Sequence, residues 1–234
     1  MRLALAGALL TILQHGVAPV QLAASFAGIF DRSLHDFYLQ SSAGIAHGIR
    51  LFGMLAIVLG LTIRSRWLAL AGAGIACLSF ASIGHTSTHS PRWLLAPLLT
   101  VHVTIVAFWF GSLRPLHRMS DRNHADVAAR LERFSWVASR AVPLILLAGL
   151  VLAYALLESF AQLLTPYGLM IIGKVSGFAL LLGLASVNRW RLVPQIRSGQ
   201  AAALSSFRKI AAIEWLTMVS LIVATVSVTS LFSP

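Results

Sequence analysis

The sequence predicts an all-α, polytopic transmembrane bundle of about seven helices, and three observations favour this fold class. Of its 234 residues, 58% are hydrophobic and only 11% are charged. The mean hydropathy of +0.83 also lies on the membrane side of ordinary globular composition. The apolar residues gather into segments of about 20 residues, the length that covers ~30 Å of hydrocarbon. A single transmembrane domain over residues 1–234 is therefore expected.

The predicted spans are residues 3–28, 43–63, 67–86, 93–113, 136–157, 168–188 and 210–231. Polar residues and Pro19 interrupt the first span, which is either one kinked helix or two shorter ones. Its charged start and apolar stretch resemble a signal peptide. No small-residue cleavage site separates it clearly from the apolar residues that follow, so we expect a retained helix. The other six spans are uninterrupted. Cys77 is the single cysteine, which excludes a disulfide within the chain.

The lysines and arginines predict the orientation of the bundle. Fourteen of the 18 lie at Arg2, in residues 64–66, in residues 114–140 or in residues 189–209. Basic residues concentrate in cytoplasmic connections of membrane proteins. The N-terminus is therefore predicted to be cytoplasmic and the C-terminus to lie outside, with short outer connections at 29–42, 87–92 and 158–167.

The charged residues also limit the classes of function. The net charge of +11 falls between apolar segments and not along one basic face, so we expect no nucleic-acid partner. The lipid bilayer is the predicted environment. Seven acidic residues are thinly spread, and no carboxylate pair, glycine-rich phosphate loop or nucleophile motif is present. Hydrolytic chemistry is therefore not supported.

Histidines supply the main functional signal. On the predicted topology, six of the eight lie in the outer half of the membrane or at its outer face, and they are His15, His35, His47, His85, His89 and His102. Ionisable side chains within a bilayer are costly and usually line a bundle interior or a pathway. A structural hydrogen bond to a neighbouring helix would explain a single buried histidine. Several histidines on different helices, all toward one side of the membrane, indicate a shared ligand instead. Neutral imidazole binds copper, zinc, iron and nickel, and it is the usual axial ligand of haem.

Other polar or soft side chains in the spans have weaker interpretations. Met54 follows His47 by two helical turns and could add a thioether ligand for Cu(I), although packing explains it as well. Lys174 either reaches outward to the interface or neutralises an anionic group. Arg50 and Arg92 at the outer rim are candidate partners of lipid head groups or of haem propionates. Glu214, level with Asn188 and Arg189, is expected to form a structural ion pair.

Several motifs resemble the copper resistance protein D (CopD) family of bacterial inner-membrane proteins. They are GHTSTHS at 84–90, HVTIVAFWFGSL at 102–113, RFSWVASRAVPLILLAGLVLAY at 133–154, TPYGLMIIGKVSGFALLLGLASVNRWRLVP at 165–194, and a last helix that opens with Glu214. The resemblance is strongest over residues 80–234. It implies multi-pass copper handling at the inner membrane, commonly uptake with a periplasmic copper-binding partner. Residue by residue it points to His85 and His102, with Trp109 as a neighbour and Lys174 as a family-typical intramembrane lysine.

Two functions remain open from the sequence. In the first, copper is captured by His89 and His85 and passed toward His47, His102 and His15, which makes the chain a transport or binding protein and not an enzyme. No comparable row of histidines continues through the cytoplasmic half of the membrane. In the second, the chain is a b-type haem redox protein. Its axial ligands would be His102 with His15 or His47, and Arg50 or Arg92 would pair with the propionates. Such a protein would be an oxidoreductase, acting as a cupric reductase or as an electron carrier to a periplasmic partner.

Overall fold

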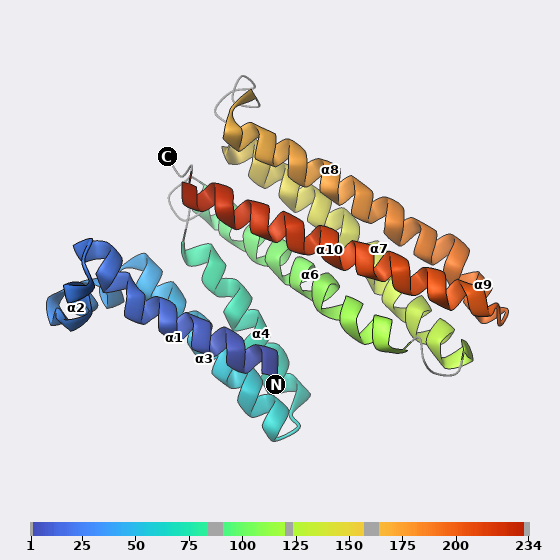
Figure 1. Cartoon of the computed structure of the whole chain (residues 1–234), viewed down its shortest axis with the longest axis horizontal. Helices are drawn as coiled ribbons and strands as arrows, with labels where there is room; N and C mark the ends of the chain where they lie inside the picture. Colours follow the sequence, from blue (N-terminus) through green and yellow to red (C-terminus); the bar gives the residue numbers. More distant parts are fainter. Residues whose placement is uncertain (1, 84–90, 120–123, 157–163, 232–234) are drawn as a thin grey trace. The chain divides into compact units, whose positions relative to one another are not determined.

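A computed structural model describes residues 2–83, 91–119, 124–156 and 164–231. The described residues are almost entirely helical and contain no strand, which confirms the predicted fold class (Figure 1). Six helices are long and apolar enough to cross a membrane, and Arg66–Ser82 is a shorter apolar helical stretch. The chain forms two compact units, Met1–Thr104 and Ile105–Pro234. The single transmembrane domain expected from the sequence stays a prediction.

Unit 1 begins with a helical hairpin. The first span is one continuous helix, although Pro19 lies inside it. A turn of 3-10 helix and a short amphipathic helix then lead back to the second span, which packs against the first. Their bounds are α1 Arg2–Ala23, η1 Phe26–Phe30, α2 Arg32–Gln40 and α3 Ser42–Thr62.

Two glycines let the next helices of unit 1 approach closely. Helix α4, Arg66–Leu78, packs along α3 and continues as a 3-10 turn η2, Ser79–Ser82. A Cβ atom added at Gly53 of α3 would lie 2.7 Å from the backbone N of Ala76 and 2.7 Å from the carbonyl O of Gly72. A Cβ atom at Gly72 would lie 2.6 Å from the carbonyl O of Gly53. The contact is therefore between two backbones, which only glycine allows.

Side chains at the helix starts fix where the helices begin. The Asp31 carboxylate accepts from the backbone N of Ser33 at 2.9 Å and caps α2. Ser41 accepts from Gly44 at the start of α3, and Ser65 accepts from Leu68 at the start of α4. These caps satisfy backbone N–H groups that have no partner within the helix.

Unit 2 holds the long helices of the second half of the chain. Helix α6 runs across the boundary between the units, and a turn of π-helix, η4, follows α8 directly. Two apolar clusters hold the unit together, one around Trp109, Leu113 and Met218, the other around Ile196 and Phe207. The bounds are α6 Arg92–Met119, α7 His124–Leu156, α8 Pro166–Val187, η4 Asn188–Leu192, α9 Val193–Arg197 and α10 Ala201–Leu231.

The structure differs from the sequence prediction mainly where connections were expected. Much of the predicted loop at 114–135 is helical, because α6 extends to Met119 and α7 begins at His124. The predicted loop at 189–209 is largely helical too. Polar residues there led the hydropathy pattern to end each span early. Charged residues continue a helix past the bilayer without breaking its backbone hydrogen bonds.

Candidate functional site

Three aromatic side chains of unit 1 meet where α1, α2 and α3 come together. His47 on α3 is only 6% exposed, and Tyr38 on α2 is 8% exposed. The Tyr38 hydroxyl and the His47 Nδ1 atom form a hydrogen bond. His15 on α1 is half-buried and meets the Tyr38 ring edge to face, with ring centroids 5.1 Å apart. The structure therefore groups two of the predicted ligands on either side of one tyrosine.

The Tyr38 hydrogen bond decides what His47 can do chemically. Burial raises the pKa of the Tyr38 phenol, and the charge of Arg50 offsets this in part, so the phenol stays protonated at neutral pH. If the phenol donates to Nδ1, the proton of a neutral ring sits on Nε2. If Nδ1–H donates to the phenol oxygen, the Nε2 lone pair is available to a metal. A hydrogen bond at the second ring nitrogen is the usual way to orient a metal-binding histidine.

Arg50 lies one helical turn after His47 on α3. Its Nε donates to the Oγ of Ser79 at 3.1 Å, and its Cζ stands 4.2 Å from the centroid of the Phe80 ring. Ser79 is fully buried, and its hydroxyl donates to the carbonyl O of Ala76 at 2.7 Å. A cationic group is thus fixed beside the Tyr38–His47 pair.

The remaining predicted residues within the described part of the chain lie on α3, α6 and α8. Met54 faces Gly7 of α1, because a Cβ atom at Gly7 would lie 3.3 Å from the Met54 sulfur. This contact supports packing between α1 and α3. His102 and Arg92 lie on α6, half-buried and exposed respectively, and Lys174 is half-buried on α8.

His85 and His89 lie outside the described residues, so their part in the predicted file stays a prediction. Among the residues that the structure does describe, no group of three His, Cys, Asp or Glu side chains could hold a metal ion. A site built from this part of the chain alone therefore supplies fewer than three such ligands.

A second polar cluster lies in unit 2 and was not predicted as a site. Glu214 on α10 is 2% exposed, and it accepts a hydrogen bond from the Asn188 amide at 2.7 Å and another from the Trp109 side chain. The expected ion pair with Arg189 does not form, since that guanidinium donates to the carbonyl O of Ser135 at 2.7 Å. Two neutral donors take the place of the cation, and they join α6 and η4 to α10.

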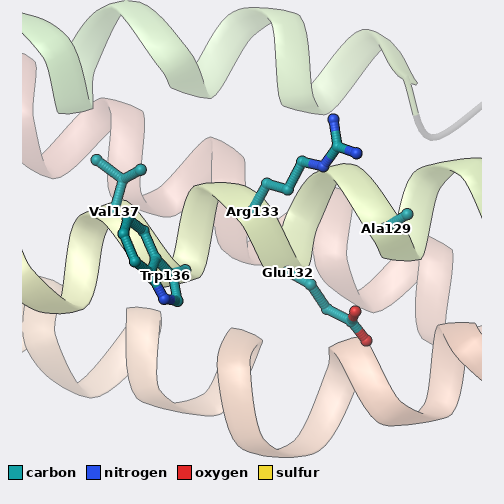
Figure 2. Close-up of a pocket in the computed structure, with 5 residues that line it drawn as sticks. All are labelled: Ala129, Glu132, Arg133, Trp136 and Val137. Carbon is teal, nitrogen blue, oxygen red and sulfur yellow. The ribbon is translucent and has the colours of Figure 1, made fainter.

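The surface of α7 carries an open groove with little chemistry of its own. Figure 2 shows its lining, which is Ala129, Glu132, Arg133, Trp136 and Val137. All five are exposed, and Glu132 pairs with Arg197 at 3.2 Å in an exposed ion pair. Such a pair contributes little to stability. The groove holds none of the predicted ligands.

The sequence prediction missed Tyr38 and Ser79. Tyr38 lies in the segment expected to be an outer connection, where a tyrosine has no evident role. The signal for it was the α2 pattern, in which Asp31 caps a short helix that turns Tyr38 inward. Ser79 offered no signal in the sequence, because a serine at a helix end is common.

Six apolar helices of membrane-spanning length, with many large apolar side chains exposed on them, define a multi-pass membrane protein. Residues 128–228 match the family model for copper resistance protein D. The inner membrane protein YebZ of Escherichia coli (strain K12) is 28% identical over 158 residues, which is 64% of this chain and 51% of that protein. Over these residues the chain is therefore similar to the copper resistance protein D family, the family that its motifs resemble.

The chain spans about half the length of this relative. No solved structure matches the chain. The matched family is named for copper resistance, and the matched relative is named as an inner membrane protein. His15 and His47 precede the residues that match the family model, whereas Asn188 and Glu214 lie within them.

Proposed function

We propose that this protein handles copper at the bacterial inner membrane, and that it binds the ion through His47 and His15. The observation that carries the proposal is the hydrogen bond between the Tyr38 hydroxyl and Nδ1 of the buried His47, with His15 on the other side of the tyrosine. Copper is the substrate that the family description suggests. The relative named as an inner membrane protein supports the location.

The chemistry of the site suits a bound copper ion. With Nδ1–H donating to the Tyr38 oxygen, Nε2 of His47 offers a lone pair to the metal. His47 lies five residues after the start of α3, about 8 Å along the helix. An ion arriving at that end of the helix meets it within the first turns.

The small number of protein ligands also suits a site that must release its copper ion. Transport requires sites that bind well enough to load and weakly enough to release. Two imidazoles leave coordination positions for groups that arrive with the ion or receive it. His85, His89 and His102 remain predicted ligands for those positions, and a periplasmic copper-binding protein remains the predicted donor. Import is the direction we propose.

A copper titration of the purified chain tests this proposal. His47→Ala should lower the affinity for copper at least tenfold, because it removes the oriented ligand. His117→Ala is the matched control, since His117 is exposed on α6 in the other unit and should leave affinity unchanged. Equal copper affinity in wild type and His47→Ala would reject the site.

A b-type haem protein is the second candidate, and one observation favours it. Arg50, a predicted propionate partner, lies beside His47, and its buried Nη2 atom meets no acceptor in the part of the chain that the structure describes. The residues present fit a haem in kind, because His47 with His15 or His102 would supply two axial imidazoles. When bound, the haem would supply one-electron chemistry. The chain's own residues would orient the ring and balance its charge.

A further inference from the structure

Arg50 brings a positive charge into the interior of unit 1. It lies eight residues after the start of α3, about 12 Å along the helix. One edge of the guanidinium is fixed, because Nε donates to Ser79 Oγ at 3.1 Å. One face is covered by the Phe80 ring, whose centroid is 4.2 Å from Cζ. The Nη2 atom is buried, and none of the described residues accepts a hydrogen bond from it.

Among the residues of unit 1 that the structure describes, no carboxylate pairs with this charge. Unit 1 contains six arginines, and its only acidic residues are Asp31 and Asp36. The Asp31 carboxylate caps α2, and Asp36 is exposed on the same helix. Positions 37–120 contain no acidic residue at all. Within the part of the chain that the structure describes, Arg50 takes part in no ion pair.

A buried charge without a partner is strongly destabilising, and so is a buried donor without an acceptor. Arg50 is half-buried, so the first cost falls on it in part and the second falls on its buried Nη2 atom. The Ser79 hydroxyl and the Phe80 ring offset these costs only in part, because neither carries a net negative charge. A bound molecule with a negative charge and oxygen acceptors would offset the rest.

We propose that Arg50 and Ser79 form a binding site for a phosphate-type oxyanion. The planar guanidinium presents N–H groups in a fixed fork that matches the oxygens of a phosphate. Ser79 and Phe80 hold the fork in one orientation. Anionic phospholipid head groups and free inorganic phosphate carry the same group, and both fit this chemistry.

Thermal unfolding of the full chain in detergent tests the site in two arms. In the first arm, inorganic phosphate is compared with chloride at equal ionic strength. In the second, phosphatidylglycerol is compared with a neutral glycolipid that lacks phosphate. We expect the phosphate-bearing ligand of at least one arm to raise Tm by about 3–6 °C at about ten times its Kd. A rise with phosphate identifies a free oxyanion, and a rise with phosphatidylglycerol alone identifies a lipid head group.

Variants show whether the effect belongs to Arg50. Arg50→Gln should abolish the rise in Tm, whereas Arg66→Gln, which changes an exposed residue at the start of α4, should keep it in full. Arg50→Lys keeps the positive charge but lacks the planar guanidinium, so it should give a smaller rise in Tm than the wild type. This variant serves as the test if Arg50→Gln fails to fold. No rise in either arm for the wild type, or an equal rise in wild type and Arg50→Gln, would overturn the proposal.

Discussion

The backbone contact between α3 and α4 gives a prediction whose size follows from the structure. Replacing Gly53 by alanine puts a Cβ atom 2.7 Å from backbone atoms of α4 and 3.0 Å from the Ala76 Cβ. Real Cβ atoms do not approach so closely, and no flexible side chain can move aside. The two helices must separate, so we expect a loss of about 1–3 kcal/mol in the free energy of unfolding, typical of an overpacked core. Tm should fall by about 2–4 °C for each kcal/mol.

Two other glycines on the same helices are matched controls. A Cβ atom at Gly48 of α3 or Gly74 of α4 meets nothing within 4 Å. Alanine at either position should therefore be neutral or stabilise the helix by up to about 1 kcal/mol, because glycine loses more backbone entropy on folding. Thermal unfolding of the variants in one detergent, followed by circular dichroism, measures the difference. Equal stability of Gly53→Ala and Gly48→Ala would show that the backbones of α3 and α4 do not pack this closely.

Three further predictions address the polar groups. Glu214→Ala should destabilise the protein by about 1–3 kcal/mol, because the Asn188 amide loses its acceptor, while Glu214→Gln keeps an acceptor and should cost less in the same unfolding assay. Tyr38→Phe should weaken copper binding by about 10–100-fold in a titration, since His47 loses the bond that orients it; unchanged affinity would separate the tyrosine from the site. The hydrogen bonds from Ser33 lower the pKa of Asp31, so its stabilising effect is present above the unfolded pKa and is lost as pH falls through the lower folded pKa. Asp31→Asn should remove that acid-side loss in a Tm-against-pH series.

Hydropathy was sufficient to predict the class of fold and the positions of most spans. Apolar length is a strong signal because a helix in lipid must satisfy its backbone internally. The same pattern could not predict that α7 begins near residue 124, since charged residues beyond the bilayer are compatible with helix or loop. It also left open whether residues 3–28 form one helix. The structure shows that α1 continues through Pro19 and ends at Ala23.

The candidate site was predicted only in part. Their predicted depth in the membrane and their predicted outer side identified His15 and His47 as candidates. In the structure both side chains contact Tyr38. Tyr38 was missed because its role depends on how α2 folds back, a tertiary feature that no spacing encodes. Glu214 was noticed as a buried acid, yet its expected ionic partner proved to be two neutral donors. A single sequence shows that a charge is buried but does not show which neighbour satisfies it.

The central claim is that the protein is a copper-handling membrane protein with its site at His47. The most direct test is to purify the chain in mild detergent and to measure its copper content and its oxidised and reduced visible spectra on one sample. We expect about one copper per chain after loading and no haem bands, with the copper lost in His47→Ala. A Soret band with reduced α and β bands, at about one haem per chain, would contradict the copper assignment and establish the haem function instead.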